Sequence, residues 1–265
     1  MSLALISGPI VLMRLVILSL IFLSVSFAKA ERFVPRRMSE SERTIALQIL
    51  GFGSASKLLT NPFPLGGHSG FEMGVSSEYL QVQDLSSLGD KSTRNRELNY
   101  NSFSVAKGLF YNVDASAHFT PAFQKEDLSS YGAQLRWGFY QFPFLPGGLS
   151  LVVDRSETNY GNLLSTQTTG QDLIATVVVE DVALYFGIGQ AKSKGTFSGG
   201  TLNGTVTESA TDACFSATYC DSVRQELNQT HTVFGVNVSF NEFFGAVEIN
   251  RYFISSYSAK IGWRF

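Results

Sequence analysis

The sequence contains little cysteine, little histidine and few charged residues. Its 2 cysteines and 3 histidines among 265 residues exclude a small domain packed around disulfides and argue against a Cys/His zinc centre. Charged residues make up 16% of the chain, and acidic residues outnumber basic ones, 22 against 20. A nucleic-acid-binding protein needs a basic face to meet the phosphates. The composition therefore excludes nucleic acid as a partner, and nothing in it indicates a cofactor or a metal.

Long apolar runs are absent from the sequence after its first thirty residues. The nearest to one, residues 173–188, is interrupted by Glu180 and Asp181. A helix needs about 20 consecutive apolar residues to cross a bilayer. The chain after residue 30 can therefore cross a membrane only as a closed β-barrel, in which every backbone group is paired. What the sequence does contain is 24 glycines, 22 Phe, 10 Tyr and 2 Trp, a composition typical of β-rich proteins.

Residues 1–30 have the features of a secretory signal peptide. They contain no acidic residue and place Arg14 before an apolar stretch at 15–27. Residues 28–30 read Ala-Lys-Ala, the pattern of a cleavage site. Because Met13 directly precedes Arg14, either Met1 or Met13 is a suitable start. We predict cleavage after Ala30, which leaves 18 basic and 22 acidic residues in the mature chain.

Apolar and polar residues alternate repeatedly from residue 66 onward. In the clearest segment, 131–140, one face holds tyrosine, alanine, leucine, tryptophan and phenylalanine, and the other holds Gln134, Arg136 and glycines. The same period of two recurs at 182–189 and 232–240. In a soluble sandwich the apolar face would form the core. In a membrane barrel that face meets lipid and the polar face lines the interior.

Turn signals divide this region into ten expected strands. These are 70–82, 98–109, 112–123, 131–143, 149–159, 171–179, 182–196, 228–240, 243–251 and 255–265. Short connections, such as 145–148 and 180–181, alternate with longer polar ones. The longer ones are 83–97, 124–130, 163–170 and 199–227. Tight turns at one end and long loops at the other are typical of bacterial outer-membrane barrels. We predict an all-β, transmembrane, antiparallel up-and-down barrel over residues 67–265, with 8 and 12 strands as alternatives to ten.

The last strand and the aromatic residues extend this prediction. Aromatic residues gather at the short-turn ends, where amphipathic rings prefer the membrane boundary. They are Phe110, Tyr111, Phe142, Phe144, Phe240, Phe243, Phe244, Trp263 and Phe265. The chain ends in YSAKIGWRF, with Tyr257, Ile261, Trp263 and Phe265 on one side. This ending resembles the C-terminal assembly signal of Gram-negative outer-membrane β-barrel proteins. The resemblance implies an integral outer-membrane protein that outer-membrane lipids surround and that the barrel-assembly machinery recognises at its final strand; it identifies no subfamily.

Residues 31–66 precede the expected barrel. Ser39 and Glu42 have the spacing of a helix start, and apolar residues from Ile45 to Leu50 suit one side of a short helix ending near Gly51 or Gly53. Such a helix would lie in the barrel as a plug or in the periplasm. The stretch TIALQILGF, residues 44–52, is alternatively an extra strand.

Charges of both signs fall on the face expected to point inward. They are Glu72, Glu78, Asp114, Arg136, Asp154, Glu248, Lys260 and Arg264. Buried charges persist only when they are paired or hydrated, and the interior of a barrel of about eight strands is filled by side chains. We therefore predict a narrow or occluded lumen with an ionic network. The function this suggests is a narrow pore for small polar solutes or ions; the alternative is a structural or adhesive surface barrel that binds a partner through its loops, above all 199–227.

Two smaller groups of residues bear on chemistry. Cys214 and Cys220 lie in the longest loop, on the presumed cell-surface side, and are predicted to form a disulfide. Asp114, Ser116 and His118 share the inner face of one strand and are the components of a nucleophilic triad. Same-face neighbours on a strand are about 6.6 Å apart, beyond direct hydrogen-bond reach. We therefore predict a polar lining and no enzyme, with an outer-membrane lipid hydrolase or protease as the less favoured alternative.

Overall fold

The computed structural model describes the barrel, the segment that precedes it and parts of the loops. The described residues are 34–35, 38–60, 64–89, 96–121, 128–161, 163–198, 201–202, 205–206 and 222–265. The predicted signal peptide, residues 1–30, lies outside them. Cys214 and Cys220 also lie outside them, so their predicted disulfide stays a prediction.

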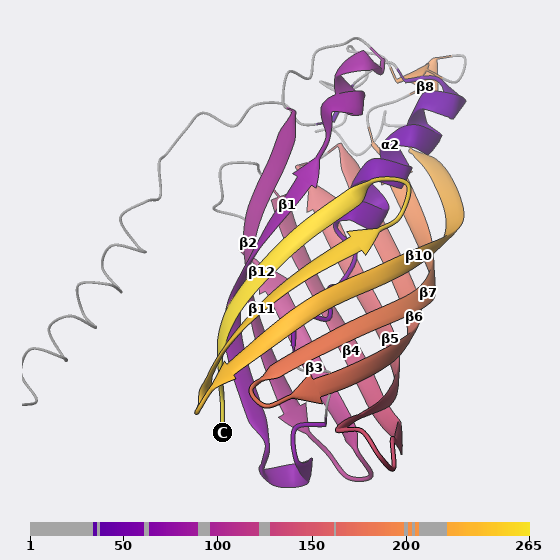
Figure 1. Ribbon diagram of the computed structural model, residues 1–265. Helices are drawn as coiled ribbons and strands as arrows, with labels where there is room; N and C mark the ends of the chain where they lie inside the picture. The colour runs from indigo at the N-terminus through magenta and orange to yellow at the C-terminus, as the bar shows by residue number, and fades with distance from the viewer. Residues whose placement is uncertain are drawn as a thin grey trace, which may run out of the picture. The chain divides into compact units, whose positions relative to one another are not determined.

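Ten antiparallel strands close into a barrel (Figure 1). Around the barrel they follow the order β1-β12-β11-β10-β7-β6-β5-β4-β3-β2. The strands are β1 (Phe71–Gln81), β2 (Glu97–Gly108), β3 (Val113–Thr120), β4 (Leu128–Gln141), β5 (Gly147–Tyr160), β6 (Leu164–Val179), β7 (Val182–Phe197), β10 (Val223–Phe240), β11 (Phe243–Arg251) and β12 (Ser255–Arg264). The two-residue strands β8 (Thr201–Leu202) and β9 (Thr205–Val206) pair separately. First and last strands join through Phe71 and Phe265, whose N–H groups donate to each other's carbonyls at 2.7 and 2.9 Å. The predicted ten-stranded all-β barrel is confirmed.

The expected long loops are wrong in part, because strands extend into them. Residues 128–130 begin β4, residues 164–170 form the first half of β6, and residues 223–227 begin β10. β5 and β6 are joined by residues 161–163 alone. These strand halves were missed because they are polar outside and carry small polar residues such as Thr166 and Thr168 inside, so no apolar face marks them.

The barrel has two unlike ends. At one end, called here the short-turn end, strands are joined by residues 109–112, 142–146, 180–181 and 241–242. Tyr111 and Asn112 both adopt positive φ there, at 58° and 59°, as a tight hairpin turn requires. At the other end, called the loop-side end, lie the longer connections, including the 3-10 helix η2 (Gln83–Ser87).

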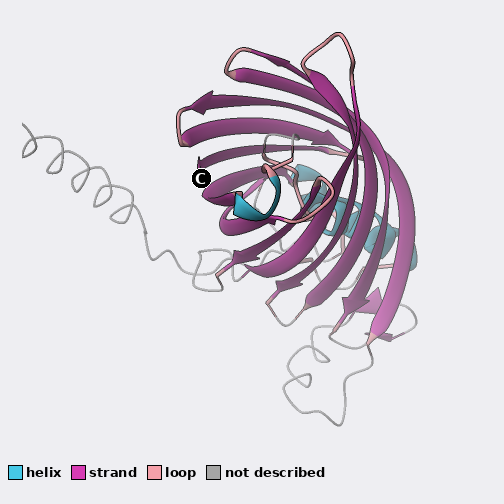
Figure 2. Ribbon diagram, turned by 90° about the horizontal axis from the view of Figure 1, so that it is seen from below, coloured by secondary structure: helices cyan, strands magenta, loops and turns pink. Residues whose placement is uncertain are grey.

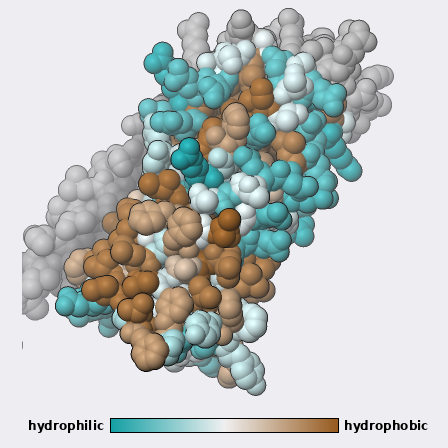
Figure 3. All heavy atoms as spheres, turned by 45° about the vertical axis from the view of Figure 1, so that its right-hand side comes forward, coloured by the Kyte–Doolittle hydropathy of each residue, from teal (hydrophilic) through white to brown (hydrophobic). Residues whose placement is uncertain are grey.

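The outer surface changes character halfway along the barrel. Figure 3 shows apolar side chains gathered over the short-turn half and hydrophilic ones over the loop-side half. β7 illustrates the change, because Leu184, Phe186 and Ile188 are 45, 56 and 57% exposed and are followed on the same face by Gln190 and Lys192. A band of exposed apolar residues around a closed barrel is the surface that meets lipid. Beyond it, β6, β7 and β10 continue into water.

The segment before β1 begins with helix α2 (Glu40–Gly53). The Ser39 backbone N–H donates to Glu42 Oε2 at 2.7 Å, and the Glu42 N–H donates to Ser39 Oγ at 3.4 Å, which completes a capping box. The Gly89 N–H also donates to Glu42 Oε1, at 3.0 Å. The N–H groups of Ser39 and Gly89 lower the pKa of the Glu42 carboxyl. The expected helix is confirmed, and the alternative of an extra strand at 44–52 is wrong. Among the described residues, no helix is both long and apolar enough to span a membrane.

Helix α2 lies inside the loop-side end of the barrel (Figure 2). The Tyr160 hydroxyl of β5 donates to the Leu50 carbonyl at 2.8 Å, and the Thr168 hydroxyl of β6 donates to the Gly51 carbonyl at 3.0 Å. The Gln225 amide of β10 donates to the Thr44 hydroxyl at 2.8 Å. Wall residues from three strands therefore hold the helix within the ring.

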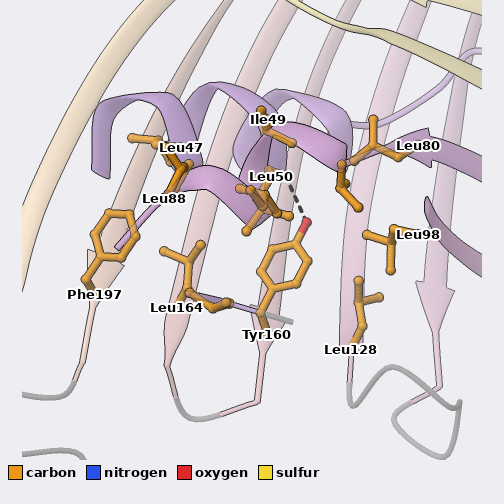
Figure 4. Packing of buried hydrophobic residues seen from close by; sticks show 14 of the residues in the cluster. Leu47, Ile49, Leu50, Leu80, Leu88, Leu98, Leu128, Tyr160, Leu164 and Phe197 are labelled. Carbon is orange, nitrogen blue, oxygen red and sulfur yellow. Dashed lines mark hydrogen bonds between the residues drawn. The ribbon is translucent and has the colours of Figure 1, made fainter. Parts of the chain in front are cut away.

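An apolar core surrounds α2 (Figure 4). Its buried members from the helix and the strand ends are Ala46, Leu47, Ile49, Leu50, Leu80, Leu98, Leu128, Tyr160, Leu164 and Phe197, joined by Val34, Met38, Val82, Leu85, Leu88 and Tyr100. The loop-side half is thus apolar inside and polar outside. The short-turn half has the opposite arrangement, with lipid outside and polar side chains within.

Candidate functional site

After α2 the chain crosses the lumen toward the short-turn end and there begins β1. This part, residues 54–60 and 64–66, is called the luminal segment. Its Leu58 contacts Glu248 of β11 by a hydrogen bond, and Leu65 contacts Asp114 of β3. The 3-10 helix η1 (Gly67–Ser69) then leads into β1 (Figure 1). The chain therefore enters the lumen at the loop-side end and leaves it at the other.

Glu248 binds the luminal segment at mid-height. The N–H groups of Leu58 and Leu59 donate to Glu248 Oε1 and Oε2 at 3.2 and 2.8 Å. The Tyr185 hydroxyl donates to Oε2 at 2.7 Å, and the Asn250 amide donates to Oε1 at 2.5 Å. With Glu248 2% exposed, this buried carboxylate is saturated by donors from the wall and from the segment.

Glu72 forms a second binding point nearer the short-turn end. Lys260 Nζ lies 2.8 Å from Oε1 and Arg264 Nη2 lies 2.7 Å from Oε2, both from β12. The Thr60 hydroxyl of the luminal segment donates to Oε2 at 2.7 Å. Arg264 Nη2 also donates to the Thr60 hydroxyl, at 3.1 Å. Two cations and one carboxylate thus share this position, and the excess positive charge lies at the partly exposed Arg264.

Asp114 and Arg136 form the third point. The two residues face each other on β3 and β4 and are ion-paired, with Arg136 Nε donating to Asp114 Oδ2 at 3.1 Å. The Leu65 N–H donates to Asp114 Oδ1 at 3.1 Å. Both charged residues are at most 5% exposed. A pair so deeply buried is favourable only with this full set of hydrogen bonds.

The structure places all eight predicted interior charges on the inward face of the wall. All except Arg264 are at most 8% exposed. Glu78 accepts from the Tyr100 hydroxyl at 2.6 Å. Asp154 of β5 lies against Gly170 of β6, where no side chain blocks it. The lumen therefore contains several separate ion pairs and hydrogen-bonded groups rather than one chain of contacts.

Sequence reasoning did not name Lys57 or Asp172 among the luminal charges, and it placed His231 on the polar face of its strand without assigning it a partner. Lys57 lies on the luminal segment, where its Nζ donates to the carbonyls of Gly53 and Ala55 at 3.1 and 2.6 Å and lies 4.0 Å from Glu78. Asp172 of β6 and His231 of β10 meet on the inner face of the barrel, over Gly189 of β7, with Oδ1 and Nε2 2.8 Å apart. Alternation along β6 would have identified Asp172, since Leu173 beside it points outward. No periodic signal marks Lys57.

The triad suggested by one strand does not assemble. Asp114 is occupied by Arg136 and by the Leu65 N–H. Ser116 donates to the Gln134 side chain at 3.3 Å, and His118 lies against Gly132. Its members therefore have separate partners, as the spacing along a strand predicts. Within the described ranges, no cluster of His, Cys, Asp and Glu is arranged to hold a metal ion.

Among the described residues, two cavities lie beside the luminal segment. One of about 40 Å³ lies between it and β1–β4 and is lined by Ser76, Ser102, Ser116 and His118. That volume accommodates roughly two or three water molecules. A larger one, of about 470 Å³, lies at the short-turn end and is lined by residues including Pro64 and Tyr140. Open space therefore reaches toward the lumen from the short-turn end, and the apolar core closes the opposite end.

The residues of the C-terminal signal lie on the outside of β12. Tyr257, Ile261, Trp263 and Phe265 are 42, 73, 43 and 58% exposed. Trp263 stacks on Phe243 with ring centroids 4.5 Å apart. These rings belong to the lipid-facing surface at the short-turn end. One expected member of the aromatic girdle is wrong: Phe244 is 3% exposed and points inward, where Lys260 Nζ lies 5.4 Å from its ring centre.

Comparison with known proteins gives matches in structure only. No protein-family model matches the sequence, and no curated protein matches it. The N-terminal β-barrel domain of Pseudomonas aeruginosa OprF is 11% identical, with a TM-score of 0.35 over 75% of this chain and 99% of that one. The KdgM porin is 10% identical, with a TM-score of 0.34 over 73% and 99%. Acinetobacter baumannii Omp33 is 8% identical, with a TM-score of 0.31 over 78% and 100%. Likeness at this level concerns the fold alone.

The geometry of this chain therefore has three parts: a lipid-facing apolar belt, a polar lumen and an apolar core at the loop-side end. A closed barrel with a belt on the outside and charges within is an arrangement suited to lipid. The chain is a closed ten-stranded β-barrel with the apolar outer belt of a membrane barrel, and its own N-terminal segment occupies the lumen.

Proposed function

We propose that this outer-membrane barrel acts at the cell surface, as a structural or adhesive barrel whose lumen is closed. The observation that supports this role is the apolar core that fills the loop-side end around α2. A solute passing through the barrel would have to displace that core. The sequence alone ranks a pore first; the core is the reason to rank the surface role above it.

The energy of the core argues for a barrel that stays closed. Leu47, Ile49, Leu50 and Phe52 of α2 are all 0% exposed. Burying a side chain of this size contributes about 1.5–3 kcal/mol, against which the entropy of ordering the helix and its linker counts. Release of α2 would return all four side chains to water. While α2 stays docked, the loop-side end is a rigid platform for contacts outside the cell.

The surface available for such contacts begins beyond the apolar belt. β6, β7 and β10 carry polar residues there, including Gln171, Lys194 and Asn228, all exposed. The predicted partner loop, 199–227, continues from β7 but lies mostly outside the described residues. Surface loops on a rigid scaffold are where binding residues concentrate.

Planar-bilayer recording of the refolded full chain tests this proposal. We expect no discrete conductance steps from the wild type. Binding to a surface partner should be lost when loop residues 203–221 are replaced by a short Gly-Ser linker. Frequent channel steps from the wild type, together with unchanged partner binding by the loop variant, would contradict the surface role.

A narrow pore for small polar solutes or ions is the second candidate. The cavity of about 470 Å³ at the short-turn end supports it, because it opens part of the lumen from that side. Conduction would then require α2 to move. A built Cβ on Gly51 would lie 3.2 Å from the Ser193 Cβ, slightly less than the spacing of about 3.5–4.5 Å in disulfides. It would also lie 2.8 Å from the Leu47 Cδ1, so the end of that side chain must shift to admit the cross-link.

A reversible cross-link separates the two candidates. The variant Gly51→Cys with Ser193→Cys, with Cys214 and Cys220 replaced by serine, would fix α2 to β7 when oxidised. A gated pore predicts conductance in the wild type and after reduction of the variant, and silence after its oxidation. A closed surface barrel predicts silence in every state.

A further inference from the structure

Three carboxylates of the barrel wall bind the luminal segment. Glu248 of β11 accepts from the N–H groups of Leu58 and Leu59, at 3.2 and 2.8 Å. Asp114 of β3 accepts from the Leu65 N–H at 3.1 Å. Glu72 of β1 accepts from the Thr60 hydroxyl at 2.7 Å. The three acceptors come from different strands, and they follow the segment along the lumen.

Most of these contacts do not depend on the side chains of the segment. Three of the four donors are backbone N–H groups, which every residue except proline possesses. A hydrogen bond from a backbone N–H to a carboxylate is charge-assisted and stronger than one between neutral groups. The wall therefore recognises the polypeptide backbone of a segment that turns at Glu248, where Leu59 has a φ of 38° and two successive N–H groups meet one carboxylate.

The acceptors are held in place by the wall itself. Tyr185 and Asn250 donate to Glu248, Lys260 and Arg264 pair with Glu72, and Arg136 pairs with Asp114. Each of these partners comes from a barrel strand. The carboxylates are thus oriented by wall residues and not by the segment, as residues that contact a ligand are held in place by their neighbours in a preorganised binding site.

We propose that the lumen is a binding site for a polypeptide segment containing a turn, which it recognises through backbone N–H groups. The luminal segment is its resident ligand, and it enters from the loop-side end and leaves at the short-turn end. This site is independent of whether the barrel acts at the surface or as a pore. It implies that the start of α2 faces the same side of the membrane as η2.

Cysteine labelling in intact cells tests the direction of threading. In a background with Cys214 and Cys220 replaced by serine, the test variant is Glu40→Cys at the exposed start of α2. The references are Ser87→Cys in η2, at the loop-side end, and Tyr111→Cys in a short turn, where the native side chain is 91% exposed. We expect a membrane-impermeant maleimide to label Glu40→Cys as it labels Ser87→Cys. Labelling that follows Tyr111→Cys would overturn the proposal, whichever end faces outward.

Residue-resolved amide exchange in lipid nanodiscs tests the recognition of the backbone. Glu248→Ala should accelerate exchange of the Leu58 and Leu59 amides at least tenfold, while the Leu65 amide keeps its rate. Asp114→Ala should have the reverse pattern. Glu248→Gln, which retains an acceptor, should give a smaller change at the same two amides and keeps the test valid if the alanine variant does not fold. Equal changes at all three amides, or none, would overturn the proposal.

Discussion

Leu50→Ala measures how firmly helix α2 is docked in the barrel. The Leu50 side chain is 0% exposed within the apolar core, and truncating such a leucine costs about 2–5 kcal/mol through lost contacts and the cavity that remains. At about 1.4 kcal/mol per factor of ten, the undocked population should rise about 30- to 4,000-fold. The Tyr160 hydroxyl binds the Leu50 carbonyl and is unaffected by the truncation. The change therefore isolates the apolar contribution.

Hydrogen exchange of the α2 amides is the assay, with the full chain in nanodiscs. We expect protection of α2 to fall by that factor while protection of the β7 amides stays the same, because opening at the helix is local. Gln48→Ala is the matched control, since Gln48 is half-buried on the same helix and its loss should change protection by about twofold at most. Unchanged α2 exchange in Leu50→Ala, or equal acceleration in β7, would refute the reasoning.

Three further predictions follow from the wall and the helix start. The pKa of Glu42 is lowered from its ordinary value of 4.5, so its stabilisation of α2 is present above pH 4.5 and is lost as the pH falls through the lowered pKa. Hydrogen exchange of the α2 amides should therefore rise in acid in the wild type, and this rise should be absent from Glu42→Gln. The same pH profile in both proteins would contradict the prediction. Leu184→Lys, within the lipid-facing belt, should lower the free energy of unfolding by about 2–4 kcal/mol in urea titrations with liposomes. Gln190→Lys, on the same face of β7 but beyond the belt, should lower it by about 0–1 kcal/mol. Equal costs for the two variants would place the lipid boundary elsewhere. Arg136→Met should lower the free energy of unfolding by about 3–5 kcal/mol, and adding Asp114→Asn should restore part of it; additive losses would mean that the pair is not coupled.

Strands in the lipid-facing half could be predicted from the sequence almost to the residue. The expected strands at 182–196 and 243–251 correspond to β7 (Val182–Phe197) and β11 (Phe243–Arg251). Lipid outside and charges inside impose a strict alternation there, and the pattern is visible in one sequence. In the water-facing part of the wall, as at residues 164–170, the outer face is also polar, so apolar and polar residues no longer alternate along the strand.

The interior site could be predicted only in its wall. Alternation identified Glu72, Asp114 and Glu248 as inward-facing, but it could not show what they bind. Their ligands are backbone N–H groups of Leu58, Leu59 and Leu65, and backbone contacts leave no trace in the residue pattern. The helix was recognisable from the capping box at Ser39 and Glu42, whereas its place inside the barrel depends on contacts with strands more than a hundred residues away.

The barrel is polar inside and apolar outside in its short-turn half, and apolar inside and polar outside in its loop-side half. This difference affects how the protein behaves in detergent. A micelle needs to cover only the short-turn half, because the other half carries its own dry interior and a wetted exterior, as a water-soluble barrel does. The extramembrane half should therefore keep its shape while detergents are exchanged, and it offers the stiff, hydrophilic surface that antibodies and crystal neighbours need.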